Sequence, residues 1–308
     1  MGRLLALGLL STLALAACTS APMAVPSATG YAAPSFSDPA MAGDIAACGD
    51  LGTRREQITC LLPRAEEAFA EAYTPVVTSR GVEFTRPKVV TPDRSAETAC
   101  GTLSRVAYCP SDATIVLPLD FLSTIGDRAA SEVEWGPKTM GYFSAKLTPE
   151  QMSSGGDFGA ITALAHEYAH HVQSLIGYER VNADLMEAQP AKASFYSSEF
   201  ELMADCFAGW MAATLDQGGV YQVEGVDQWA AVTALAEVGD DFIQERRGGT
   251  AAVQPSQTFN HGAANERANA WVEGAGYGFD GREPYQACLT LADQLIDGRT
   301  GANPTATQ

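Results

Sequence analysis

The chain has 308 residues, a formal net charge of −18 and a hydrophobic content of 46%. This length and composition suit one sizeable hydrophobic core or two small ones. A surface this acidic repels nucleic acid and anionic lipid headgroups, so we expect no nucleic-acid partner.

The first 17 residues have the pattern of an export signal. Arg3 supplies a positive charge, and the apolar run that follows ends in small residues. The run is too short for a transmembrane helix. Leu15-Ala16-Ala17-Cys18 resembles the lipobox of bacterial lipoproteins, which predicts cleavage before Cys18 and lipidation of its thiol. The residue after Cys18 is Thr19, whereas lipoproteins retained in the inner membrane have Asp at this position, so the expected location is the outer membrane. The alternative is an ordinary signal peptide without lipidation.

The remaining chain is predicted to form a single domain between two unstructured segments. Residues 18–44 are rich in Ala, Pro and Ser, which predicts a flexible tether that does not pack. Residues 45–300 would form the domain, and residues 301–308 a disordered tail.

The cysteines predict three disulfide bonds, because six of them remain after Cys18 in an exported chain. Several connectivities are open, and the short separations favour two pairs and leave a third. Cys206 is also an alternative metal ligand or nucleophile. The favoured pairs are Cys48–Cys60, Cys100–Cys109 and Cys206–Cys288.

The hydrophobic pattern predicts an α+β chain that is mostly α-helical. Residues 45–75 favour a helix, and residues 83–120 favour short strands at Val89-Val90, Val106–Tyr108 and Thr114–Leu117. The Cys100–Cys109 bridge would pin this small β element. Beyond Asp157 the pattern predicts only helices, at about 157–176, 195–216, 225–246, 261–274 and 283–297.

His166 and His170 are four residues apart, so on a helix their side chains lie on one face, one turn apart. Two neutral imidazoles at this spacing can bind one Zn²⁺, and Glu167 beside them can take a proton from water without being a ligand. The apolar flanks predict a buried helix, which argues against the alternative of two unrelated histidines. His171 would face away from the metal, in a supporting or structural role.

A catalytic zinc site needs a third protein ligand and an open position for water. Gln173 and Ile176 stand where the metzincin pattern has Gly and His, so that class is excluded. Glu201 is the predicted third ligand, and Asp205, one turn later, would accept a hydrogen bond from the far nitrogen of a ligand histidine. Glu199 is the competing ligand, although Asp205 would then not lie one helical turn after the ligand.

His261 is the remaining histidine. Peptide hydrolysis benefits from a hydrogen-bond donor at the carbonyl oxygen where negative charge develops, and His261 is the candidate. Arg267 would organise it or form a structural ion pair. Tyr168 and Tyr196 are weaker donor candidates, and a purely structural His261 at a helix N-terminus is the alternative.

From about Cys100 to Gly276 the chain resembles the bacterial neutral zinc metallopeptidases. The resemblance implies a zincin fold, a Glu third ligand and hydrolysis. Two blocks also look like those of the CaaX prenyl endopeptidases, which are built on membrane-spanning helices. The chain departs from the family pattern at Arg105-Val106-Ala107 and at Ala263. The metal-binding residues do not depart from it. The blocks are Ala99-Cys100-Gly101, Tyr108 to Asp112, Val116 to Phe121, Ala165 to Gln173, Glu201 to Gly209, Gly239-Asp240-Asp241 and His261 to Arg267.

The sequence therefore predicts a zincin-like metallopeptidase of the bacterial cell envelope that cleaves peptide or protein substrates. Zn²⁺ would lie on His166, His170 and Glu201. The rival is a non-hydrolytic envelope lipoprotein, chaperone-like or scaffold, with a structural zinc. A fourth protein ligand, such as Cys206 or His261, would favour the rival.

Overall fold

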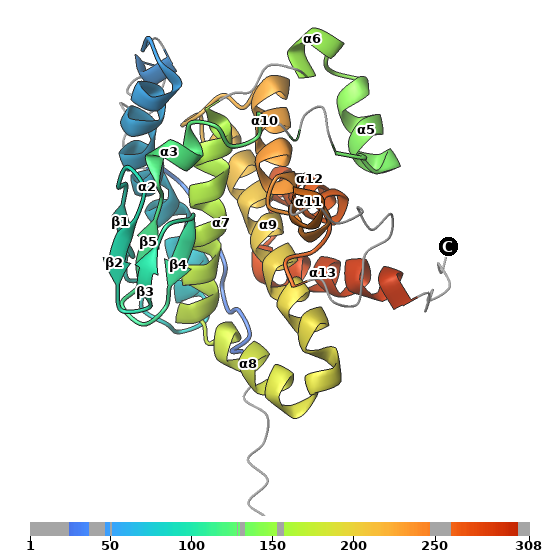
Figure 1. Ribbon diagram of the computed structural model, residues 1–308. Coiled ribbons are helices and arrows are strands. Elements are labelled where there is room, and N and C mark those ends of the chain that lie inside the picture. The colour runs from blue at the N-terminus through green and yellow to red at the C-terminus, as the bar shows by residue number, and fades with distance from the viewer. Residues whose placement is uncertain are drawn as a thin grey trace, which may run out of the picture.

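The computed structural model describes residues 25–36, 47–49, 51–127, 129, 133–152, 157–246 and 260–300. The predictions for the export signal, for Cys18 and for the tail 301–308 lie outside these residues. The described chain is mostly helical with a small sheet (Figure 1), as predicted.

Helix α7 (Phe158–Leu175) lies at the centre of the molecule (Figure 1). It is buried along most of its length because apolar residues occupy nearly all of its faces. It packs against α2 (Arg54–Thr78), α9 (Ala193–Gln217) and α10 (Gly225–Ala236). Helix α7 thus carries His166, Glu167 and His170, which form an HExxH sequence, into the core.

Two helices near the C-terminus cover the far side of α9. These are α12 (Ala264–Phe279) and α13 (Pro284–Thr300). The crossing of α9 and α12 is very close at Gly209, where a Cβ atom would lie 1.9 Å from the carbonyl oxygen of Trp271. Only glycine fits there, so the chain can bring the polar groups of α12 next to those of α9.

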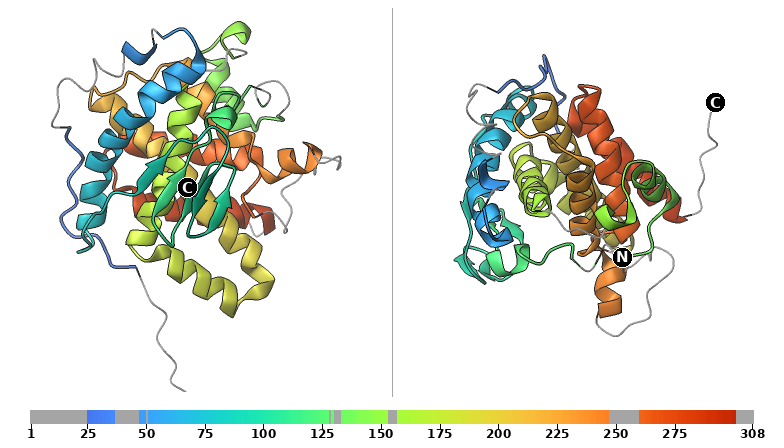
Figure 2. Two further views of the ribbon diagram at one scale, coloured as in Figure 1. Left: turned by 60° about the vertical axis from the view of Figure 1, so that its left-hand side comes forward. Right: turned by 90° about the horizontal axis from the view of Figure 1, so that it is seen from above.

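A three-stranded sheet lies beside α7 and α2 (Figure 2). Its order is β1 (Lys88–Val90), β5 (Thr114–Val116) and β4 (Ala107–Cys109), with β1 parallel and β4 antiparallel to β5. Strand β4 is therefore an edge strand. A separate hairpin of β2 (Ala96–Thr98) and β3 (Gly101–Leu103) was not predicted.

The helical prediction after residue 157 differs from the structure in two places. Helix α8 (Tyr178–Ala188) was missed; Gly177, with φ +81°, ends α7 and lets a short polar helix begin at once. The predicted helix 225–246 is two helices, α10 and α11 (Asp240–Arg246). The break falls at Gly239, where a Cβ atom would lie 2.6 Å from the backbone nitrogen of Ala264.

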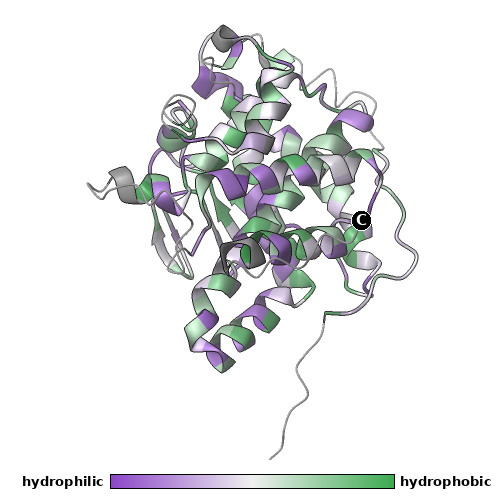
Figure 3. Cartoon of the chain, turned by 90° about the vertical axis from the view of Figure 1, so that its right-hand side faces the viewer, coloured by the Kyte–Doolittle hydropathy of each residue, from purple (hydrophilic) through white to green (hydrophobic). Residues whose placement is uncertain are grey.

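Short helical segments complete the fold. Helix α8 and the first turns of α9 form a hairpin that projects from the body, with polar and apolar residues alternating around it (Figures 1 and 3). No helix in the described ranges has both the length and the apolar character needed to cross a bilayer. The remaining segments are α3 (Leu119–Leu122), α5 (Pro137–Ser144), α6 (Pro149–Met152) and the 3-10 turn η1 (Pro190–Lys192).

Part of the predicted tether packs against the body, which corrects the expectation for residues 25–36. The Thr29 backbone N–H donates to the carbonyl oxygen of Ser79 at 2.7 Å. Val25, Tyr31 and Phe36 contact the core. Composition predicted a free chain, but three isolated large side chains are enough to hold this stretch.

All three favoured cysteine pairs lie at disulfide distance in the structure. Their Cα–Cα separations are 5.5 Å for Cys48–Cys60, 5.8 Å for Cys100–Cys109 and 5.6 Å for Cys206–Cys288. The Cys100–Cys109 bridge joins the β2–β3 turn to β4, so it ties the two sheets together. The Cys206–Cys288 bridge ties α9 to α13.

Candidate metal centre

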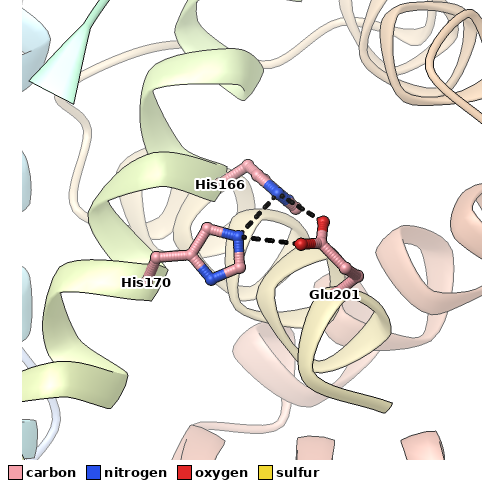
Figure 4. A group of neighbouring side chains, drawn as sticks. All are labelled: His166, His170 and Glu201. Carbon is pink, nitrogen blue, oxygen red and sulfur yellow. Dashed lines mark hydrogen bonds and ion pairs between the residues drawn. The ribbon is translucent and has the colours of Figure 1, made fainter. Parts of the chain in front are cut away.

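Three predicted ligands meet where α7 packs against α9 (Figure 4). The Nε2 atoms of His166 and His170 lie 3.1 Å apart. Glu201 reaches across from α9 and places one carboxylate oxygen 3.3 Å from His166 Nε2 and the other 3.6 Å from His170 Nε2. In the described chain this is the one group of three or more His, Cys, Asp or Glu side chains close enough to hold a metal ion.

These separations fit a zinc ion. Ligand atoms at about 2.0–2.1 Å from a tetrahedral Zn²⁺ lie about 3.3 Å from one another, and the three observed separations lie on both sides of that value. Three protein ligands also leave the fourth tetrahedral position open, as in catalytic zinc sites.

The hydrogen bonds of the two histidines leave their Nε2 atoms available to bind a cation. His166 Nδ1 lies 2.8 Å from Asp205, and His170 Nδ1 lies 2.8 Å from Gln173 Oε1. The Gln173 amide nitrogen donates to the Phe200 carbonyl, which leaves its oxygen to accept. Both imidazoles in their neutral form therefore carry the proton on Nδ1 and turn bare Nε2 lone pairs toward each other and toward Glu201.

Asp205 joins His166 to a buried arginine. Arg267 donates to both carboxylate oxygens of Asp205, from Nε at 2.7 Å and from Nη2 at 2.8 Å. Its Nη1 donates to the Val238 carbonyl at 3.3 Å. Both side chains are almost fully buried, so the pair excludes water from behind the histidine. The sequence predicted that Asp205 accepts from a ligand histidine and that Arg267 either organises His261 or forms an ion pair, and in the structure Arg267 forms its ion pair with Asp205.

The electrostatics of the centre favour positive charge. Burial raises the pKa of Glu201, but His170 and His166 outweigh it and hold the pKa well below its usual value. Burial lowers the pKa of His166, whereas the carboxylates of Asp205 and Glu201 raise it to about 10. Either a proton or a metal ion would satisfy this excess of negative charge.

The centre opens into a cavity of about 700 Å³. Glu167 lines this cavity with the three ligands, and its burial raises the pKa of its carboxyl group above the ordinary value. Residues of β4, including Ala107 and Tyr108, form another wall. The cavity thus places a carboxyl group and a strand edge beside the metal position.

The description "Putative neutral zinc metallopeptidase" names the family whose model matches residues 140–288. The match covers just under half of the chain, and this part is similar to that family. The match contains α7, α9 and α12, and so it contains the three ligands, Asp205 and Arg267. Zinc is the cofactor that the family name and the ligand geometry both indicate.

The chain is also similar to proteins from other bacteria. The Escherichia coli K12 protein YpfJ is 29% identical over 219 residues, which cover 70% of this chain and 65% of YpfJ. The Mycobacterium bovis protein Mb2605 is 32% identical over 202 residues, covering 62% of this chain and 59% of Mb2605. The chain therefore matches less than two thirds of the length of these relatives, all of which are named as uncharacterized. No solved structure matches this chain.

His261, the predicted oxyanion donor, lies at the cavity but outside the ligand group. Its Nδ1 is 3.1 Å from Asp240, and half of its side chain is exposed. The hydrogen bond to Asp240 raises the pKa of His261. The other predicted alternatives lie elsewhere: Glu199 is hydrogen-bonded to Tyr178, and Tyr168 has its buried hydroxyl without a partner.

His171 ties the central helix to the sheet; the sequence predicted a supporting or structural role for it but did not predict its partners. Its Nε2 donates to the Thr85 carbonyl at 2.7 Å, so its Nδ1 accepts from the Tyr108 hydroxyl at 3.1 Å. Gln173 was likewise missed as the partner of His170. Its position three residues after His170, on the same helical face, was the available signal.

Proposed function

We propose that the chain is a zinc-dependent peptide-bond hydrolase of the bacterial cell envelope. The observation that carries the proposal is the meeting of His166, His170 and Glu201 in a cavity that Glu167 also lines. Zinc held there would acidify a water molecule and polarise the substrate carbonyl.

Glu167 is the general base in this proposal. It takes the proton from the attacking water and then passes it to the leaving amine. Gln173 and Asp205 fix the proton of each ligand histidine on Nδ1, and Arg267 fixes Asp205 in turn. His261 donates to the carbonyl oxygen as charge develops there, and Asp240 favours its protonated form.

The edge strand supports a peptide as the substrate. In the described chain β4 pairs with β5 alone, and residues of β4 line the cavity. An extended peptide can add to such a strand edge through main-chain hydrogen bonds. We assign the arrangement to the zincin type, because the HExxH helix lies beside an edge strand of an antiparallel pair.

The envelope location rests on the lipobox at Cys18 and on the cysteine pairs. Three disulfides suit an oxidising compartment. Mass spectrometry of the mature N-terminus tests this part: a lipid-bearing Cys18 supports it, and an unmodified N-terminus in the wild type refutes the anchor.

The rival with a structural zinc needs a fourth protein ligand. Cys206 is paired with Cys288, and His261 is paired with Asp240. Neither belongs to the ligand group found in the described residues. The open fourth position supports hydrolysis.

The test uses the purified full-length chain. We expect one zinc ion per chain by elemental analysis and cleavage of a peptide library that chelation abolishes. Glu167→Gln should lower cleavage by about 10² or more while zinc stays bound. Glu187→Gln, an exposed change on α8, is the matched control. Absence of stoichiometric zinc, or unchanged cleavage by Glu167→Gln, rejects the proposed function.

A further inference from the structure

We propose that one half of the cavity selects an apolar side chain on the substrate residue next to the scissile bond. This inference rests on the proposed function and names the substrate class of the same site. The half in question lies along the N-terminal turns of α7, and we call it the apolar half. It is lined by Phe121, Ile125, Ala163, Ala234, Leu235, Val238 and Ile243.

The position of the apolar half follows from contacts along α7. A Cβ atom on Gly159 would lie 3.2 Å from Ala234 Cβ and 3.7 Å from Ile125 Cγ2. Gly159 precedes His166 by about two helical turns. The apolar half therefore extends from the metal centre toward the start of α7.

The apolar half also adjoins the reacting groups. Ala163 precedes Glu167 by four residues, so the two side chains lie on one face of α7. The Val238 carbonyl accepts from Arg267, which in turn contacts Asp205. A side chain that enters between Ala163 and Val238 belongs to a residue directly beside the bond held at the metal.

The opposite half of the cavity has different chemistry. There Phe200 stacks on His170 with ring centroids 4.8 Å apart, and the Tyr108 hydroxyl is hydrogen-bonded to His171. Arg105 and Glu179 line the same end. Charged and hydrogen-bonding substrate groups find partners at this end, so the selection for apolar side chains is confined to one side of the scissile bond.

The physical cause of the selection is desolvation. All seven lining side chains of the apolar half are hydrocarbon, so a charged substrate side chain placed there loses water without gaining a partner. A leucine or phenylalanine side chain removes apolar surface from water on both partners. One methylene group in such a pocket changes selection by about 10-fold or more.

Binding of chelating probes tests the inference independently of catalysis. Two peptide hydroxamate series, with the test side chain on the acyl or the amine side of the chelating group, are titrated into zinc-loaded Glu167→Gln protein. We expect the leucine probe to bind at least about 10-fold more tightly than the alanine probe in one series only, and the glutamate probe to bind weakest there.

Two variants change the shape of the apolar half without touching the metal set. Val238→Phe narrows it and should reverse the preference toward alanine, whereas Phe121→Ala widens it and should favour larger side chains. Val272→Phe, at a half-buried valine of α12 outside the cavity lining, is the matched control and should leave the preference unchanged.

The outcomes separate the two proposals. Equal zinc-dependent affinity for leucine, alanine and glutamate probes in both series overturns the inference and leaves the proposed function standing. A shift in Val238→Phe no larger than in Val272→Phe, with Phe121→Ala also unchanged, overturns it as well. Absence of zinc, and hence of any probe binding, overturns the proposed function and this inference together.

Discussion

Replacement of Asp205 by asparagine should damage both the stability of the fold and the metal centre. The carboxylate accepts from His166 and Arg267 on one oxygen and from Arg267 again on the other. An amide of the same shape has one accepting atom, so its NH₂ group must face a donor on one side. Asp205→Asn therefore leaves a donor unpaired at a fully buried position.

The expected loss of stability follows from the burial of the pair. The Arg267 side chain is 2% exposed and that of Asp205 is 0% exposed. Removal of one partner from a buried ion pair costs about 3–5 kcal/mol, because the other charge stays behind without compensation. For a domain of this size the urea midpoint should fall by about 1–2 M.

The assay measures urea unfolding of wild type, Asp205→Asn, Arg267→Met and the double variant, each with a chelator present. The double variant buries no charge at this position, so the coupling energy of the cycle should be about 1–3 kcal/mol. Zinc affinity, from competition with a chromophoric chelator, should fall by about 10–100-fold in every variant that lacks the carboxylate. Additive stability changes, or wild-type zinc affinity in Asp205→Asn, would refute the reasoning.

Three further predictions address the groups around the centre. Asp240 raises the pKa of His261, so protonated His261 persists to higher pH and is lost as the pH rises through that pKa. Asp240→Asn should therefore move the alkaline limb of the kcat/KM profile to lower pH. An alkaline limb that does not move would contradict the role of His261. Tyr108→Phe should raise KM several-fold with zinc content unchanged, since β4 loses a hydrogen bond to α7; loss of zinc would point to a different role. Gly209→Ala should lower the free energy of unfolding, measured by chemical denaturation, by about 3 kcal/mol or more, because the added Cβ atom has no room. Gly276→Ala, on the open surface of α12, should be neutral or stabilising. Equal effects of the two substitutions would contradict the packing argument.

The parts of the site that the sequence predicted are those encoded by helical spacing. His166 and His170 share a face of α7, and Glu201 and Asp205 share a face of α9. Each pair is local, so its geometry follows once the helix is assigned. Asp205 also separated Glu201 from Glu199, because only Glu201 places a second carboxylate one turn on.

The parts that the sequence did not predict depend on contacts between distant segments. The Tyr108–His171 hydrogen bond joins a strand to a helix 63 residues later. Residues 25–36 dock because their few large side chains find sites on a surface built by the rest of the chain. Neither contact has a periodic signature, since it depends on the assembled fold and not on local backbone geometry.

The crossing of α9 and α12 shows how such a long-range contact completes a locally encoded site. The spacing of Glu201 and Asp205 places a ligand and its neighbour on α9, yet the histidine orientation also needs the charge of Arg267 from α12. That charge can approach only because Gly209 removes the side chain that would separate the helices. The glycine therefore supports the metal centre through the packing of the two helices. Any substitution that forces the helices apart should weaken zinc binding even though it contacts no ligand, by lengthening the Arg267–Asp205 hydrogen bonds.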